Sequence, residues 1–188
     1  WLAHKMGLPA KSFRVATNQN DILFRFFTSG EYQQDDVQPS HAPSMDIQAA
    51  SNFERYLYFT LGEDPAEVRD VMAKMKAGEP VTLPKAESNF RSTRMDDAQI
   101  VRVIAQMWKD WQYVIDPHTA CAFTDMAQDG VSVVLSTAHP AKFPDVVKQA
   151  TGNEPTHPTL EALKSKPLQT HPLPASVEAV KAFIAAHS

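Results

Sequence analysis

Apolar and polar residues follow one another along this chain in a pattern that predicts mostly helices. In the clearest example, residues 96–111, Ile100, Ile104 and Met107 recur every three or four positions, which places them on one face of an α-helix. Asp21 is expected to cap the helix predicted at residues 22–29, because Asp is a favoured N-cap residue. The predicted helices cover residues 22–29, 53–61, 64–77, 96–111, 116–126 and 144–150, a short stretch near 160, and the segment from 176 onward.

Two segments predict β-strands. Residues 12–17 are apolar and partly β-branched, and a polar turn follows them. Residues 131–137, Val-Ser-Val-Val-Leu-Ser-Thr, are apolar on both faces apart from their serines, which is typical of an inner strand in a parallel sheet covered by helices. Residues 81–94 are expected to be extended or irregular, residues 31–43 to form a loop, and residues 44–48 to form an interrupted short strand.

Many helices with two or three strands between them indicate the α/β class. Because two or three parallel strands make a poor sheet alone, we expect an incomplete piece of a larger domain, with few parallel strands flanked by many helices. Residues 1–6 resemble the last turns of a helix, with Gly7 as its stop, so we also expect a fragment of a longer protein. An inner strand without neighbours further predicts an exposed apolar seam at residues 131–135.

Composition excludes several functions. The 188 residues carry 18 basic and 22 acidic side chains, a net charge of −4, without a basic stripe, which argues against a nucleic-acid partner. No apolar run is long enough to span a membrane. The single cysteine, Cys121, cannot form an internal disulfide, which favours a cytoplasmic location. The seven histidines include no His-x-x-x-His pair, so no metal site is expected.

The first candidate motif is Ser-Thr-Ala-His-Pro-Ala-Lys-Phe at 136–143, at the C-terminal end of the expected inner strand. Open parallel sheets bind ligands beyond that end of their strands, and a hydroxyl there can donate to or accept from a ligand nitrogen. The alternative is that Thr137 merely ends a strand and Pro140 turns the chain.

Two more motifs lie at expected helix starts. Asp-Pro-His-Thr-Ala at 116–120 opens a helix and contains small residues that would let a ligand approach, although a plain N-cap would look the same. Ser-Met-Asp-Ile-Gln at 44–48 precedes Ser-Asn-Phe-Glu-Arg at 51–55, and a helix N-terminus can bind an anion. The alternative here is a strand edge followed by a capping residue.

Taken together, seven segments resemble the threonine synthase family in order and spacing, over about residues 1–152. The last segment and Ser-Asn-Phe-Glu-Arg are the most specific. The segments are Lys-Met-Gly-Leu-Pro at 5–9, Val-Ala-Thr-Asn at 15–18, Asn-Asp-Ile-Leu at 20–23, Pro-Ser-Met-Asp-Ile at 43–47, Ser-Asn-Phe-Glu-Arg at 51–55, Asp-Pro-His-Thr-Ala at 116–120 and Ser-Thr-Ala-His-Pro-Ala-Lys-Phe-Pro at 136–144.

The resemblance implies a fold type II pyridoxal 5'-phosphate (PLP) enzyme, similar to the tryptophan synthase β chain, that converts O-phospho-L-homoserine and water to L-threonine and phosphate. It implies that Thr137 faces the pyridine nitrogen of the cofactor, with Asp116, His118, Thr119 and His139 as neighbours behind it. The family's Schiff-base lysine motif and its Gly-Asn-Phe-Gly phosphate loop do not occur in this chain. The isolated chain is therefore expected to be inactive and to lack PLP, and its main partner would be the missing N-terminal portion.

By the same resemblance, residues 1–152 form the C-terminal part of the PLP-binding catalytic domain. Residues 153–188 form a helical extension that packs on the same domain. Lys142 stands in the His-Pro-Ala-Lys-Phe motif and is not expected to be the cofactor lysine. Two other functions stay open: a related PLP-dependent phospho-lyase, and a non-catalytic binding module built on the same fold.

Overall fold

The computed structural model describes residues 1–188 except 84–88, 125, 127–129 and 188. It divides into two compact units, Trp1–Thr156 and His157–Ser188. The elements in chain order are α1 (Leu2–Lys5), β1 (Phe13–Thr17), α2 (Ile22–Ser29), β2 (Glu31–Tyr32), the 3₁₀ turn η1 (Pro43–Met45), α3 (Phe53–Thr60), α4 (Pro65–Lys76), β3 (Val81–Thr82), β4 (Phe90–Arg94), α5 (Asp97–Trp111), α6 (Pro117–Ala120), the 3₁₀ turn η2 (Pro140–Lys142), α7 (Pro144–Thr151), α8 (Pro158–Lys164) and α9 (Val177–His187).

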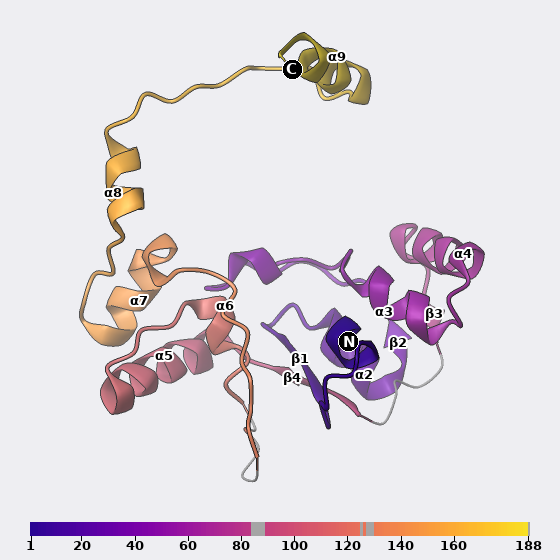
Figure 1. Ribbon diagram of the computed structural model, residues 1–188, viewed down its shortest axis with the longest axis horizontal. Coiled ribbons are helices and arrows are strands. Elements are labelled where there is room, and N and C mark those ends of the chain that lie inside the picture. Colours follow the sequence, from indigo (N-terminus) through magenta and orange to yellow (C-terminus); the bar gives the residue numbers. More distant parts are fainter. Residues whose placement is uncertain (84–88, 125, 127–129, 188) are drawn as a thin grey trace. The chain divides into compact units, whose positions relative to one another are not determined.

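The first unit is built around a parallel pair of strands, β1 and β4, which lie side by side with Phe13 opposite Phe90 (Figure 1). β2 and β3 form a short antiparallel pair. These strands among many helices confirm the α/β class and the predicted first strand. The prediction of a loop from residue 31 is wrong for its first two residues, which form β2.

Residues 131–137 do not form the predicted strand. Val131, Val133 and Leu135 are 92%, 80% and 75% exposed. The physical reason is that no strand of the described residues runs beside this segment, so it has neither ladder hydrogen bonds nor a covered face. The inner-strand prediction is therefore wrong for this chain, and the predicted exposed apolar seam is present.

Two further predictions differ from the structure. The turn η1 takes the place of the strand expected at 44–48. Helix α6 ends after one turn at Ala120, although a helix to 126 is expected, and part of that stretch lies outside the described residues. Pro43 and Pro117, each at the first position of its turn, favour a helical start in both places because the proline ring presets the backbone angle φ.

Aspartates begin several helices, but Asp21 does not cap α2 as expected. Its carboxylate instead pairs with Arg25 at 3.0 Å and with Arg94 at 2.6 Å. Asp64 and Asp96 do accept backbone N–H groups at the starts of α4 and α5. The difference follows from available partners. Two arginine side chains reach Asp21, whereas within the described part of the chain Asp64 and Asp96 form no salt bridge.

Two buried cores hold the first unit together. One joins α2, α3, α4 and β4 and combines aliphatic side chains with stacked and edge-on rings, which include Phe26, Phe53 and Tyr56. The other joins α5 and α7 to α6, with Ile100 and Ile104 among its fully buried members. This second core fixes the position of α6. Two polar residues of that helix, His118 and Thr119 of the Asp-Pro-His-Thr-Ala motif, are also buried.

The second unit contains α8 and α9. The ring of Phe183 stacks on His187 and contacts His171. Val177, Val180 and Ile184 of α9 are exposed. That residues 153–188 pack on the preceding domain stays a prediction. Within the described residues, every helix is too short or too polar to span a lipid bilayer.

Candidate functional site

The candidate site begins at the start of α6, where Asp116 caps the helix. Its Oδ1 accepts hydrogen bonds from the backbone N–H groups of His118, at 2.9 Å, and Thr119, at 3.4 Å. Asp before Pro is a strong opener of a helical turn, so this local structure is the one predicted from the sequence. The difference from an ordinary cap is burial, because Asp116 is only 1% exposed.

Burial makes Asp116 the centre of a side-chain network. Its Oδ1 also accepts from His118 Nδ1 at 3.0 Å, and its Oδ2 accepts from the Thr119 hydroxyl. A carboxylate has about four acceptor positions, and four donors meet it here. Burial raises the pKa of Asp116, but the hydrogen bonds from His118 and Thr119 outweigh it, and the net pKa is lowered. Asp116 is thus an ionised, saturated acceptor and not a general base.

His118 connects α6 to the turn η1. Its Nδ1 donates to Asp116, and its Nε2 accepts the backbone N–H of Ser44 at 3.0 Å. These two hydrogen bonds assign the ring proton to Nδ1. The Phe143 ring packs against the imidazole at a centroid distance of 4.7 Å. His118 therefore serves as a buried link between two segments that lie 74 residues apart in the chain.

Thr137 is attached to the same network through its main chain. Its backbone N–H donates to the Thr119 hydroxyl oxygen at 3.2 Å. The Thr137 side chain is exposed, and its hydroxyl makes no hydrogen bond to any residue that the structure describes. The backbone is consequently fixed while the hydroxyl is available to a ligand.

A cavity of about 580 Å³ opens at this point. Asp116, Thr137 and His139 line it, whereas His118 and Thr119 lie behind Asp116. The lining residues are Tyr113, Val114, Ile115, Asp116, Ser136, Thr137, Ala138, His139, Pro140, Pro155 and Thr156.

His139 and Lys142 belong to the turn beside this cavity. The Nδ1 atom of His139 accepts the backbone N–H of Ala141 at 3.1 Å and so caps η2. Lys142 is exposed and is not among the described residues that line the cavity. His139 is thus placed to shape the rim, and its role toward a cofactor stays a prediction.

Sequence reasoning missed the residues that fix the Ser44 turn. Asp46 Oδ1 accepts from Asn18 Nδ2 at 2.7 Å and from Asn20 Nδ2 at 3.0 Å, and Ser40 Oγ donates to it at 2.6 Å. Asn18 and Asn20 are buried. Closely spaced amides after a strand were a visible signal of buried polar partners, but nothing in the sequence names Asp46 as their common acceptor.

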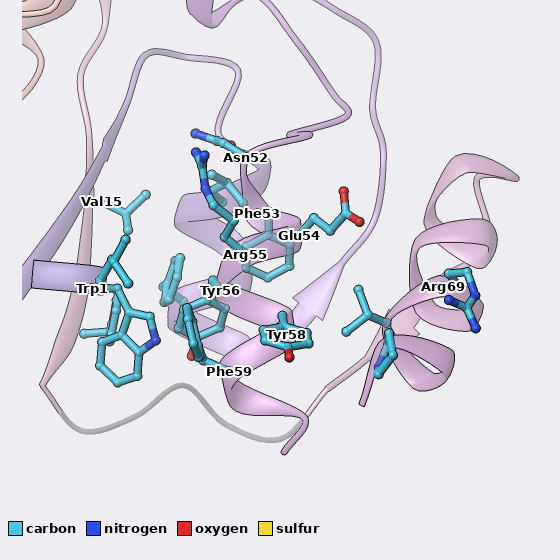
Figure 2. Close-up of a pocket in the computed structure, with 16 residues that line it drawn as sticks. Trp1, Val15, Asn52, Phe53, Glu54, Arg55, Tyr56, Tyr58, Phe59 and Arg69 are labelled. Atoms are coloured by element: carbon cyan, nitrogen blue, oxygen red, sulfur yellow. The ribbon is translucent and has the colours of Figure 1, made fainter. Parts of the chain in front are cut away.

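A second, larger cavity of about 880 Å³ shares no lining residue with the first. Figure 2 shows Trp1, Tyr56 and Phe59 gathered on one side of it and Arg69 on the other. The Ser-Asn-Phe-Glu-Arg motif contributes Asn52 and three neighbours to this lining, so the third candidate motif is divided between two places. Its walls are mostly apolar, and it holds none of the predicted cofactor residues.

Among the described residues, no group of three or more His, Cys, Asp or Glu side chains is suited to hold a metal ion. The chemistry available at the smaller cavity is hydrogen bonding by neutral hydroxyls, that of Thr137 among them, beside a buried anion, Asp116.

Comparisons with known proteins point to one family. The family model described as "Threonine synthase, C-terminal" matches residues 118–184. Threonine synthase of Pseudomonas aeruginosa is 35% identical over 199 residues, which cover 100% of this chain and 42% of that protein. The chain therefore spans about two fifths of the length of the relatives that it matches.

Solved structures give the same correspondence. A PLP-bound threonine synthase from Brucella melitensis is 36% identical, with a TM-score of 0.84, and the match covers 100% of this chain and 42% of that one. The yeast threonine synthase is 33% identical, with a TM-score of 0.79, over 97% of this chain and 43% of that one. Sequence and fold agree over almost the whole chain, which therefore belongs to the threonine synthase family and corresponds to the C-terminal part of its members.

Proposed function

We propose that this chain forms the ring-nitrogen side of the PLP site in a threonine synthase, which converts O-phospho-L-homoserine and water to L-threonine and phosphate. The observation that carries the proposal is the Thr137 hydroxyl, which is exposed at a cavity while its own backbone is fixed by Thr119. The Brucella relative, solved with PLP, supports PLP as the cofactor. The remaining part of the active site would come from the portion that the longer relatives possess.

The described residues fit such a cofactor. A cavity of about 580 Å³ has room for a substituted pyridine ring. The Thr137 hydroxyl can donate to a ring nitrogen, and no other described residue competes for it. Asp116 also lines the cavity, but its carboxylate is saturated by His118 and Thr119. The hydroxyl, and not the carboxylate, is the group that would meet the ring.

PLP, when bound, supplies the electron sink for proton removal from the substrate carbons. The contribution of this chain is to orient the ring and to set the charge of its nitrogen. A neutral hydroxyl donates a hydrogen bond without offering a full negative charge, so it does not favour a protonated ring as a carboxylate would. Thr137 would thereby keep the ring a weaker sink, which favours elimination over transamination.

We also propose a cytoplasmic location. The one cysteine, Cys121, is buried and has no second thiol in the chain with which to pair. A protein without an internal disulfide suits a reducing compartment.

The direct test is an assay of phosphate release from O-phospho-L-homoserine with added PLP. The complete protein should release phosphate and form L-threonine, and the 188-residue chain alone should do neither. A complete protein that binds PLP but releases phosphate with another product would instead indicate the related phospho-lyase. A complete protein that binds no PLP would contradict the proposal and favour a non-catalytic module.

Two substitutions test the role of Thr137 in the complete protein. Thr137→Val keeps the shape and removes the donor, so PLP binding should weaken by about 1–3 kcal/mol, the cost of an unpaired buried polar group, and turnover should slow. Thr137→Asp places a carboxylate there and should increase side reactions relative to elimination. If Thr137→Val matches the parent in PLP affinity and turnover, Thr137 has only a structural role and does not contact the cofactor.

A further inference from the structure

The hydroxyl of Thr119 lies between the two parts of the candidate site. It accepts the backbone N–H of Thr137 at 3.2 Å and donates its own proton to Asp116 Oδ2. Thr119 is buried, and so is Asp116. One oxygen atom therefore joins an exposed chain segment to a buried anion.

This contact matters because none of the strands that the structure describes pairs with the segment before Thr137. Residues 131–136 belong to no strand, and their side chains are mostly exposed. A segment without ladder hydrogen bonds is free to vary in its backbone angles. The bond from the Thr137 amide to Thr119 anchors the main chain at Thr137, which lines the cavity.

We propose that Thr119 is a positioning residue that sets the direction of the Thr137 hydroxyl, and that Asp116 and His118 extend this support to the turn at Ser44. The inference rests on the proposed function, since the Thr137 hydroxyl matters only where a ring nitrogen meets it. Four hydrogen bonds make up this support. Ser44 N–H donates to His118 Nε2, and His118 Nδ1–H donates to Asp116. The Thr119 hydroxyl also donates to Asp116, and Thr137 N–H donates to the Thr119 hydroxyl oxygen.

Only a hydroxyl can make both contacts of Thr119, because a single atom must accept one proton and donate another. Thr119→Val removes both contacts at nearly constant shape. Thr119→Ser restores both without the methyl group. Thr28 offers a matched control on the exposed side of α2, since its hydroxyl donates to the Phe24 carbonyl at 2.8 Å and lies 3.5 Å from Ser92 Oγ, far from the candidate site.

The first measurement is hydrogen exchange at the Thr137 amide in the complete, PLP-free protein. Thr119→Val should speed exchange there about tenfold, the effect of losing one hydrogen bond, whereas Thr119→Ser and Thr28→Val should exchange like the parent. This readout needs neither cofactor nor activity, so it tests the inference even if the proposed function is wrong.

The second measurement is PLP affinity in a double-mutant cycle with Thr137→Val. If Thr119 acts through the Thr137 hydroxyl, Thr119→Val should weaken PLP binding about tenfold in the parent and by less than about twofold once Thr137 is already valine. A merely structural role would weaken binding equally in both backgrounds.

The outcomes separate the two claims. Parent-like exchange at Thr137 in a folded Thr119→Val protein overturns the positioning role, and so does additivity in the cycle. A parent protein that binds no PLP overturns the proposed function. In that case the hydrogen-exchange result still tests whether Thr119 holds the Thr137 amide. If Thr119→Val does not fold, Thr119→Ala takes its place, and equal Thr137 exchange in the serine and alanine variants overturns the inference.

Discussion

Two neighbouring segments of the candidate site, residues 116–120 and 131–137, show the reverse of the usual distribution of polar side chains outside and apolar side chains inside. The first segment buries Asp116, His118 and Thr119, and the second exposes Val131, Val133 and Leu135. They meet where the Thr137 amide donates to Thr119. Polar groups are inside and apolar groups outside within one small region.

The difference shows that burial here follows the supply of partners and not hydropathy. Each buried polar atom around Asp116 has a hydrogen-bond partner, so its desolvation is compensated. No strand in the described part of the chain lies beside the apolar segment to cover it. Hydrophobicity alone cannot bury a strand whose backbone groups would then be unpaired. The comparison therefore predicts opposite responses of the two segments to reagents, mutation and pH.

The largest expected contrast is in thiol reactivity. Burial, with the Asp116 charge adding to it, raises the pKa of Cys121 from 9.0 to about 12. At pH 8 its thiolate fraction should thus be about a thousandfold below that of an ordinary thiol. In a Val133→Cys protein, an aromatic disulfide reagent should modify the new, exposed thiol at position 133 at once. It should modify the buried thiol of Cys121 only after the protein is unfolded in urea. Similar rates for both thiols would contradict the burial contrast.

The same shift has a consequence at high pH. Because the folded protein holds the thiol proton more tightly than the unfolded chain does, the stability linked to Cys121 is fully present below about pH 9 and is lost as the pH rises toward about 12. Cys121→Ala should flatten this part of the stability profile.

The next largest effect is expected for Asp116→Ala. It leaves the His118 and Thr119 donors unpaired in a buried place, which should lower the free energy of unfolding by about 3 kcal/mol or more. Asp64→Ala is the matched control, since Asp64 is also followed by proline and caps a helix, but on the surface. Its loss should be about 1 kcal/mol. Urea unfolding measures both, and equal losses would show that the buried network adds nothing to the cap.

A smaller, pH-dependent effect should come from the Asp116 charge. Its folded-state pKa lies below the ordinary 3.8, so the stability it contributes is fully present above about pH 3.8 and is lost as the pH falls through the folded-state pKa. The parent and Asp116→Asn should thus converge in stability below pH 3.8. Unfolding free energies measured from pH 6 down to pH 2.5 test this, and a constant difference over that range would rule it out.

The smallest effect is expected in the exposed segment. Val133→Ala in this chain should change the free energy of unfolding by less than about 0.5 kcal/mol, since the side chain is 80% exposed. Val147→Ala, the same change in the core between α5 and α7, should cost about 2 kcal/mol. If strands from the rest of a complete protein cover residue 133, the cost of Val133→Ala there should approach that of Val147→Ala. A cost that stays small in the complete protein would mean that the segment remains exposed.

Most helices follow from the sequence, because their signals are local. The apolar period in α5 and the Asp-Pro pairs before α4 and α6 require no distant contact. Asp21 shows the limit, since its choice between capping α2 and pairing with Arg94 depends on a strand that lies 73 residues away in the chain.

The sequence named the candidate residues but not the hydrogen bonds between them. The sequence and its family resemblance pointed to Thr137, Asp116, His118, Thr119 and His139, and hydrogen bonds join the first four in the structure. Their role toward a cofactor stays a prediction. The bond from Ser44 to His118 and the amide contacts of Asp46 could not be predicted. Such bonds depend on the distance between side chains that the fold brings together, and no local pattern encodes that distance.

The sequence by itself therefore determined where helices begin, that the class is α/β, and which residues could carry the chemistry. Only the tertiary structure decided that Asp116 is buried and saturated, that Thr137 keeps its hydroxyl available, and that residues 131–135 are exposed. The physical reason is that helical hydrogen bonds close within four residues, whereas strand pairing and buried polar networks require partners from distant parts of a chain.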